Sequence, residues 1–327
     1  MIAAVLAKPN APLELREISW LQPEYGQVYV KILATGICGA QLQEIRGEKG
    51  SYFPRLLGHE AAAIVERVGS GVTKVAAGDL CVAHWRKGAG VESQSPRFRM
   101  GSQEHTAGQI TTFSECSVIS ENRLTKVPSS TPVELCSLLG CALSTAFGTI
   151  ENEANVKFGE RVLIIGCGGL GLSLVLAARL RGALVYVDDI ACEKVRTAIS
   201  MGAKHVTESE DFDVVIDTSG NEDAIAGGLF SMAASGRFVM VGQPRPRASI
   251  TIQNARHLFE GEGKSICATQ GGSFNPSQDV TRYVALHQLG YFDTKALITH
   301  RSPLSKINDA LDLVRNGHAG RVLIENK

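Results

Sequence analysis

The first third of the chain alternates hydrophobic and polar positions with a period of two, which is typical of half-buried β-strands. The predicted strands cover residues 28–33, 61–68 and 80–83. A glycine turn at 69–71 follows the second strand, and another at 78–79 precedes the third. Because these strands follow one another without an intervening helix, the pattern predicts a small, mostly β domain.

The pattern becomes helical over residues 131–151, and after Gly159 predicted strands alternate with predicted helices. This alternation predicts a doubly wound parallel sheet, so the expected fold class is α/β plus β. Near the C-terminus, Pro303 opens a predicted helix that ends at Gly317. The later predicted strands are residues 162–165, 185–187, 213–216, 237–241, 264–269 and 321–324.

Residues 161–194 predict a strand, a glycine turn, a helix and a second strand, which is the order of a dinucleotide-binding unit. Gly166, Gly168 and Gly171 spell G-x-G-x-x-G, and Gly169 belongs to the same turn. The first glycine permits the tight turn, the second lets a pyrophosphate approach the backbone, and the third lets the helix pack on the strand. The helix N-terminus is expected to face the phosphates.

Asp189 follows the second strand, at the position from which a carboxylate meets the ribose hydroxyls of NAD. Its charge would repel the 2′-phosphate of NADP, and residues 190–192 offer no cation to receive that phosphate. NAD is therefore the predicted cofactor. Lys194 is either a contact to the adenosine ribose or a solvated helix residue.

The 327 residues are 44% hydrophobic and carry 33 basic and 33 acidic side chains, a composition typical of a soluble two-domain enzyme. Without net charge or a long basic run, nothing points to a nucleic acid or an anionic membrane as partner. The longest apolar stretches are too short to span a membrane. The N-terminal residues alternate like a strand and lack the features of a signal peptide, so we expect a cytoplasmic protein.

Eight cysteines without close regular spacing do not suggest a disulfide scaffold, so each is expected to be a metal ligand or a core residue. Cys38 lies in GICGAQ, His59 and Glu60 lie in LGHEAA, and Cys141 lies in LLGCALSTAFG. Two thiolates and one imidazole form a known ligand set for catalytic zinc, with alcohol dehydrogenase as the known example. Such widely spaced ligands make no motif by themselves, and any one cysteine is more commonly a buried structural residue.

Over essentially its whole length, the chain resembles the zinc-dependent medium-chain dehydrogenase/reductase superfamily of alcohol and polyol dehydrogenases. The matching stretches also occur in the family's order and at its separations. They are G-I-C-G at 36–39, G-H-E at 58–60, V-G-x-G-V-x-x-x-x-x-G-D at 68–79, T-F-S-E at 112–115, L-x-G-C-x-x-S-T-x-x-G at 138–148, and the glycine turn.

This resemblance implies a GroES-like β-barrel catalytic domain formed by residues 1–142 and 273–327. A Rossmann NAD-binding domain, residues 143–272, would be inserted into it. The resemblance also implies a homodimer or homotetramer, which in the family pairs through the final strand of the cofactor domain.

The resemblance further assigns roles to individual residues. Cys38, His59 and Cys141 match the ligands of one catalytic zinc, and Glu60 matches the acid that lies behind the metal. A residue beside the nicotinamide and an arginine that contacts the pyrophosphate are matched by Thr145 and Arg321.

One departure from the family follows Asp79, where many members carry four cysteines for a structural zinc. Here the stretch LCVAHWRKGAGVESQSPRFRMGSQEHTAGQI contains only Cys81, so the number of ligands excludes a structural zinc. The stretch has two interpretations. It forms a solvated loop, or it lines the substrate entrance with its cations Arg86, Lys87, Arg97 and Arg99 and with His84 and Trp85 at its start.

A second departure concerns the path of the alcohol proton. The family usually has Ser or Thr two places after Cys38 and a histidine a few residues further on. Here these residues are Ala40 and Gln43, and neither can relay a proton in the usual way. The acceptor is then a water held by Gln41 or Gln43, or the imidazole of His84. We favour water, because His84 adjoins an aromatic wall residue.

We therefore expect a zinc-dependent, NAD-linked oxidoreductase that interconverts a secondary alcohol and a ketone, with a small molecule as its partner. A sugar, cyclitol or polyol substrate is favoured, because Gln41, Gln43, His84 and Trp85 combine hydrogen-bonding groups with an aromatic wall. QGGSFNP and HWRKG also look similar to dehydrogenase-like proteins associated with surface-polysaccharide sugars. The alternatives are a metal-independent enone or quinone reductase of the same fold, and a dinucleotide-binding protein without catalysis.

Overall fold

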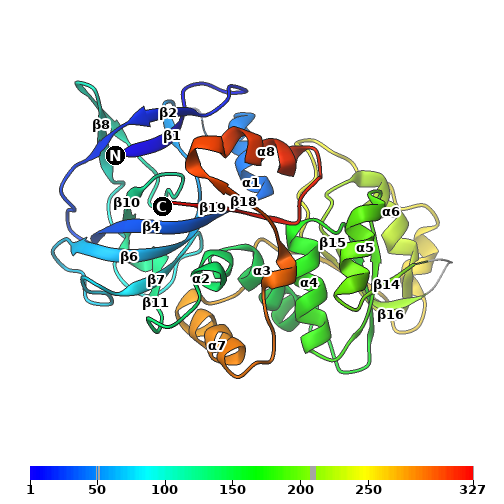
Figure 1. Ribbon diagram of the computed structural model, residues 1–327. Helices are drawn as coiled ribbons and strands as arrows, with labels where there is room; N and C mark the ends of the chain where they lie inside the picture. Colours follow the sequence, from blue (N-terminus) through cyan, green and yellow to red (C-terminus); the bar gives the residue numbers. More distant parts are fainter. Residues whose placement is uncertain (49, 51, 207–210, 327) are drawn as a thin grey trace. The chain divides into compact units, whose positions relative to one another are not determined.

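A computed structural model describes residues 1–48, 50, 52–206 and 211–326. The chain forms two units, of which the first comprises Met1–Cys141 and Asn275–Lys327 and the second comprises Ala142–Phe274. The second unit is therefore inserted into the sequence of the first. In Figure 1 the C-terminal strand accordingly lies beside strands from the N-terminal part of the chain.

A largely antiparallel sheet of seven strands forms the centre of the first unit, in the order β11-β7-β6-β4-β19-β18 with β10 also pairing with β4 (Figure 1). The C-terminal strand β19 pairs with the end of β4, where Val322 lies opposite Ile37. The strands are β4 (Gln27–Ile37), β6 (Glu60–Val68), β7 (Leu80–His84), β10 (Cys116–Ser120), β11 (Leu124–Lys126), β18 (Ile298–Pro303) and β19 (Arg321–Glu325).

Two three-stranded sheets, β2-β1-β5 and β3-β8-β9, complete the β-structure of the first unit. Ile307 and Leu311 of α8 pack in one core with Ile37, Ile45 and Val322, which holds the C-terminal helix on the sheet. The other strands and α-helices described in this unit are β1 (Ile2–Leu6), β2 (Glu14–Glu17), β3 (Ser19–Trp20), β5 (Arg55–Leu56), β8 (Arg97–Met100), β9 (Gln103–Thr106), α1 (Gly39–Ile45), α2 (Val133–Leu139), α7 (Pro276–Gln288) and α8 (Ile307–Arg315).

The second unit is built on a six-stranded sheet in the order β14-β13-β12-β15-β16-β17, and every pairing in it is parallel. The doubly wound sheet predicted from the alternating pattern is thereby confirmed. The elements are α3 (Ala142–Gly148), β12 (Arg161–Ile165), α4 (Gly169–Leu180), β13 (Leu184–Asp188), α5 (Cys192–Ser200), β14 (Lys204–His205), β15 (Phe212–Asp217), α6 (Glu222–Phe230), β16 (Met232–Met240) and β17 (Ser265–Ala268).

Two helical predictions differ from the structure in their details. The helical pattern over residues 131–151 resolves into α2, α3 and a π-helix at residues 149–153. Gly140 ends α2 in close packing, since a Cβ there would lie 2.2 Å from the Ala83 carbonyl oxygen. Pro303 closes β18 and is the N-cap of a 3-10 helix at residues 304–306, which leads directly into α8 at Ile307, so the helix predicted to open at Pro303 begins as a 3-10 turn.

The three motif glycines occupy different environments where β12 leads into α4: Gly166 lies in the turn, Gly168 is the N-cap of α4, and Gly171 lies in its first turn. Gly166 has a φ of +92°, which favours glycine, and it makes the tight turn. A Cβ on Gly171 would lie 1.8 Å from the Gly166 carbonyl oxygen, whereas a Cβ on Gly168 would meet nothing within 4 Å. Gly168 therefore borders open space, while Gly171 permits close packing of the helix on the turn.

Within the described residues, no single helix is both long enough and apolar enough to cross a membrane.

We predict that Gly171→Ala lowers the free energy of unfolding by roughly 1–3 kcal/mol, because the new methyl group must displace the backbone of the turn. This cost exceeds the gain of about 1 kcal/mol that alanine normally brings inside a helix. Urea unfolding without cofactor measures the change. Gly168→Ala is the control and should cost less than Gly171→Ala, at most about 1 kcal/mol, because a Cβ at this N-cap meets no atom within 4 Å and only the N-cap preference for glycine is lost. Equal stability of the two variants would contradict the packing role of Gly171.

Candidate functional site

Cys38, His59 and Cys141 come together in the first unit, with one potential ligand atom from each within 4.8 Å of the others. Cys38 follows β4 and is the N-cap residue of α1, His59 immediately precedes β6, and Cys141 follows the glycine that ends α2. Among the described residues, no second group of three or more Cys, His, Asp or Glu side chains has this spacing.

The two thiols of this cluster lie at the outer limit of hydrogen-bonding distance for sulfur. The Cys141 thiol donates a hydrogen bond to the Cys38 sulfur across 4.0 Å. This bond lowers the pKa of Cys38 well below its usual value, and the same contact, together with burial, raises the pKa of Cys141 well above it. A metal ion would take the place of the Cys141 thiol proton, since thiolates are the ligating form of cysteine.

His59 presents one bonded and one unsatisfied ring nitrogen. Its Nδ1 lies 2.6 Å from the side-chain amide nitrogen of Gln41. Its Nε2 is buried and has no hydrogen-bond partner, a state that costs about 1–3 kcal/mol for a buried polar group. Two sulfurs and one unsatisfied imidazole nitrogen fit a zinc ion with a fourth position left open.

Gln41 is fully buried and acts within the protein, although the sequence made it a candidate substrate contact. Its side-chain oxygen accepts a hydrogen bond of 2.9 Å from the backbone N–H of Cys38. Cys38 is the N-cap and Gln41 the N3 residue of α1, so this bond is half of a capping box. The sequence carries only half of the usual capping-box signal, because the N-cap is Cys38 instead of Ser or Thr, and it gives no sign of the contact between Gln41 and His59.

Glu60 and Arg321 form a buried ion pair beside the cluster, with side chains 0% and 3% exposed. Burial raises the pKa of Glu60 despite the neighbouring guanidinium. Burial alone would lower the pKa of Arg321, but the charge of Glu60 and the nearby cysteine sulfurs raise it. Arg321, the predicted pyrophosphate contact, thus lies in β19 of the first unit with its guanidinium on Glu60.

His84, a candidate substrate contact and proton acceptor, is fully buried at the end of β7. Its Nδ1 lies 2.7 Å from the Arg86 carbonyl oxygen, and its Nε2 lies 3.0 Å from the Thr125 hydroxyl. Burial lowers the pKa of His84 to about 4, so the ring is neutral near pH 7. With both nitrogens bonded inside the protein, His84 is a packed wall residue.

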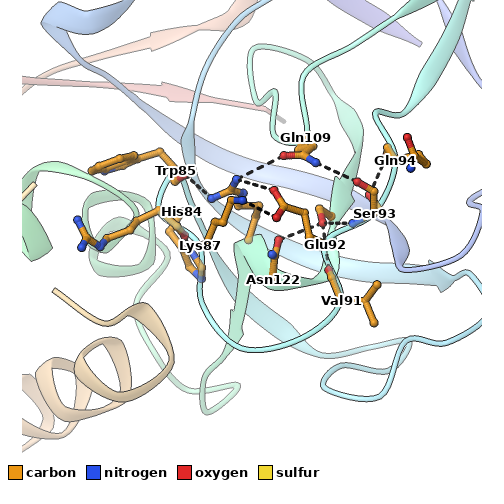
Figure 2. A network of polar contacts seen from close by, with 12 residues as sticks. His84, Trp85, Lys87, Val91, Glu92, Ser93, Gln94, Gln109 and Asn122 are labelled. Atoms are coloured by element: carbon orange, nitrogen blue, oxygen red, sulfur yellow. Dashed lines mark hydrogen bonds and ion pairs between the residues drawn. The ribbon is translucent and has the colours of Figure 1, made fainter. Parts of the chain in front are cut away.

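The loop after β7 holds its cations in internal contacts (Figure 2). Lys87 forms an ion pair with Glu92, and Arg123 donates to the Trp85 carbonyl oxygen at 2.8 Å while lying 3.7 Å from Glu92. Gln109 lies between Arg123 and Ser93 (Figure 2): its side-chain oxygen accepts from Arg123 at 3.4 Å, and its amide nitrogen donates to the Ser93 carbonyl oxygen at 2.9 Å. Because a carboxylate already pairs with Lys87, these contacts favour a solvated loop over a cationic substrate entrance.

The other cations of the predicted loop are also engaged within the protein, and two of them, Arg97 and Arg99, lie in strand β8. Arg97 pairs with Glu24 and Glu104, and Arg99 pairs with Glu104 across the β8–β9 hairpin. The Arg86 guanidinium lies 6.0 Å from the centre of the Trp85 ring. Trp85 keeps partial exposure, as does Gln43 on α1.

In the second unit, the Asp189 carboxylate fixes the glycine turn. It accepts hydrogen bonds from the backbone N–H groups of Cys167 at 2.7 Å and Ala191 at 2.8 Å. Lys194 lies 4.0 Å from the same carboxylate, so its ammonium is near the predicted ribose-binding acid. Asp188, by contrast, ends β13 with an exposed side chain. Thr145 is buried in α3.

Two residues of this unit were missed by the sequence analysis. The Thr218 hydroxyl donates to the Gly166 carbonyl oxygen at 2.9 Å and so supports the glycine turn from β15. Asp217 is buried, and burial raises its pKa, while its carboxylate accepts hydrogen bonds from Ser219 and Gly220. The signal was the run D-T-S-G directly after a predicted strand, since such turns lie at the carboxyl edge of a parallel sheet.

Comparison with known proteins gives matches over both units. The sequence model of the alcohol dehydrogenase GroES-like domain matches residues 24–129, and that of the zinc-binding dehydrogenase domain matches residues 169–287. An alcohol dehydrogenase zinc-binding domain protein from Burkholderia ambifaria has a similar structure, with a TM-score of 0.91 at 25% identity over 100% of this chain and 98% of that one.

Two further solved structures are similar over the whole chain. Benzyl alcohol dehydrogenase from Acinetobacter calcoaceticus has a TM-score of 0.89 at 25% identity, covering 100% of this chain and 99% of that one. A short chain alcohol dehydrogenase from E. coli CFT073, solved in complex with NADH, has a TM-score of 0.78 at 20% identity, covering 100% and 99%.

The inserted parallel sheet, the GroES-like unit and these matches together define the class of protein. The chain belongs to the zinc-type medium-chain dehydrogenase/reductase superfamily. It is homologous to alcohol dehydrogenases, so its chemistry is that of an oxidoreductase. The fold class and the family inferred from the sequence are confirmed.

We predict that stability falls as the pH drops from about 6.5 to 4, because His84 must stay neutral in the folded state. His84 takes up a proton near pH 6.5 in the unfolded chain but only near pH 4 in the folded chain. The free energy of unfolding therefore falls by up to about 3 kcal/mol as the pH drops from 6.5 to 4. Urea unfolding at pH 7, 6, 5 and 4 measures the loss. His84→Asn, which cannot titrate, should show a smaller loss, and an unchanged pH profile would count against His84 as its source.

Proposed function

We propose that this protein is a zinc-dependent, NAD-linked oxidoreductase that interconverts a secondary alcohol and a ketone. The observation that carries the proposal is the partly buried cluster of Cys38, His59 and Cys141, whose potential ligand atoms lie within 4.8 Å of one another and in which the buried His59 Nε2 has no hydrogen-bond partner. A metal-independent reductase would have no need for two sulfurs and an unsatisfied imidazole nitrogen at one place.

Zinc would be held by Cys38, His59 and Cys141, and NAD by the glycine turn and Asp189. When bound, zinc supplies Lewis acidity to a substrate oxygen, and NAD accepts or returns a hydride. Gly168 borders the open space that a pyrophosphate requires, because even a Cβ there meets no atom within 4 Å. The similar E. coli CFT073 protein was solved with NADH in the same type of fold.

The chain's own residues constrain how a proton leaves the alcohol. Ala40 has no hydroxyl group, Gln43 does not titrate, and both nitrogens of His84 are engaged inside the protein. We therefore assign the proton transfer to water. Gln43 is partly exposed and can orient such a water, whereas Gln41 is fully buried.

Within this reaction class we propose a polyol-like secondary alcohol, such as a sugar or cyclitol. The support is chemical: Gln43 offers hydrogen-bond donors and an acceptor, and Trp85 offers an apolar ring, and both keep partial exposure. An NAD-linked activity screen of sugar alcohols against simple aliphatic and aromatic alcohols tests this choice.

One zinc per chain is the expected result of elemental analysis on protein purified after zinc-replete expression. Cys141→Ser should lose most of the metal, because one of three ligands is gone, yet still bind NADH when titrated by fluorescence. Cys192→Ser is the matched control, since Cys192 is exposed and lies outside the cluster. Two zinc ions per chain, or none, would contradict the proposed site.

The second expectation concerns the cofactor. NAD should be preferred over NADP by at least roughly tenfold, on the order of 1.4 kcal/mol, since a carboxylate opposes a phosphate. Asp189→Ala should narrow this ratio, measured as the two dissociation constants. Asp188→Ala, which removes the neighbouring exposed charge, should leave the ratio of the two dissociation constants unchanged. Equal binding of NAD and NADP by the unmodified chain would show that Asp189 does not read the ribose.

A further inference from the structure

The side chain of Gln41 makes two hydrogen bonds whose directions can be assigned. Its oxygen faces the backbone N–H of Cys38 at 2.9 Å, and its nitrogen faces His59 Nδ1 at 2.6 Å. A backbone N–H can only donate, so the amide oxygen must be the atom that faces Cys38. The amide NH₂ group, which can also only donate, is therefore directed at His59 Nδ1.

This arrangement requires His59 Nδ1 to accept a hydrogen bond. In a neutral imidazole one nitrogen carries the proton and the other accepts, so an accepting Nδ1 places the proton on Nε2. Nε2 is the nitrogen left without a partner among the ligand atoms of Cys38 and Cys141. The hydrogen bond from Gln41 thus favours the tautomer in which the proton occupies the ligating nitrogen.

A zinc-bound His59 needs the opposite arrangement. When Nε2 binds the metal, the ring proton lies on Nδ1, and a histidine ligand usually donates this proton to a carboxylate, a carbonyl oxygen or water. The NH₂ group of Gln41 would then meet an N–H donor. The conflict is relieved only if the amide turns over, and its NH₂ group then faces the N–H of Cys38.

We propose that Gln41 is a positioning residue that weakens zinc binding in this protein, because it presents a donor where the zinc-bound imidazole requires an acceptor. The inference rests on the proposed zinc site and adds a property of it. Loading the metal costs the chain one of the two Gln41 hydrogen bonds, so the zinc is held less tightly and exchanges more readily than with an acceptor at this position.

The decisive variant is Gln41→Glu, which keeps the length and shape of the side chain. One carboxylate oxygen can accept from the Cys38 N–H while the other accepts from the His59 Nδ1–H, so both bonds persist with zinc in place. We expect the zinc dissociation constant to fall by about 10- to 100-fold, the usual size of such effects on metal affinity. Competition of the purified protein with a chromophoric zinc chelator at fixed pH measures it.

Gln43→Glu is the control for charge. It adds the same negative charge to the same helix, two residues further on, without taking part in the hydrogen bond to His59. Its zinc dissociation constant should change by less than about threefold. An equal gain in Gln43→Glu and Gln41→Glu would show that the effect is general electrostatics and would overturn the proposal.

Gln41→Met provides a test that adds no buried charge. Methionine has a similar length and cannot donate, so the metal-free and zinc-bound forms lose the same hydrogen bonds and zinc binding no longer costs one of them. This variant should bind zinc at least as tightly as the unmodified chain. A loss of tenfold or more would show that the amide supports the zinc-bound ring, which is the opposite of the proposal.

The outcomes separate this inference from the proposed function. Zinc bound with the same affinity by the unmodified chain and Gln41→Glu overturns the inference and leaves the proposed zinc enzyme standing. Failure of the unmodified chain and of every variant to bind zinc overturns both. The proposal is supported if Gln41→Glu binds zinc more tightly than the unmodified chain, Gln43→Glu binds it with unchanged affinity, and Gln41→Met binds it at least as tightly.

Discussion

The buried ion pair between Glu60 and Arg321 connects the two segments that make up the first unit. Glu60 begins β6, next to His59, whereas Arg321 begins β19, after the inserted second unit. Breaking a buried pair leaves an uncompensated charge, at a cost of about 3–5 kcal/mol, so the returning strand and the strand at the site depend on each other. Gly36 leaves the necessary room, because a Cβ there would lie 2.6 Å from both charged groups.

The same pair shapes the electrostatics of the proposed zinc site. The contact between the two sulfurs is the main cause that lowers the pKa of Cys38 and raises that of Cys141; the Arg321 guanidinium adds to the lowering at Cys38 and partly opposes the raised pKa of Cys141, to which the Glu60 carboxylate contributes. Two sulfurs and one carboxylate around one guanidinium leave a net negative site once both thiols ionise, which favours a divalent cation. The negative charge of the cluster therefore favours zinc, the same ion that its sulfur and nitrogen donors favour. The hydrogen bond from Gln41, in contrast, disfavours the His59 tautomer that zinc binding requires.

The fold class was predictable because its main signals are local. Between Gly166 and Gly171 the backbone needs one positive φ, at Gly166, and one close backbone contact, at Gly171. Glycine is the residue type that meets both requirements, so a short motif records them. Element boundaries were less predictable where packing between distant segments decides them. The helical pattern over 131–151 breaks at Gly140, because the end of α2 packs against the Ala83 backbone, a contact that periodicity does not reveal.

By itself the sequence determined the family, the order of the elements and the residue types available for chemistry, since motifs record short-range requirements of backbone and ligand. Only the tertiary structure decided how particular side chains are used. Gln41 contacts His59 rather than solvent, His84 is bonded through both nitrogens, and Lys87 pairs with Glu92. The reason is physical: whether a polar side chain is free for a ligand depends on burial and on partners brought close by the fold, and no local pattern encodes these.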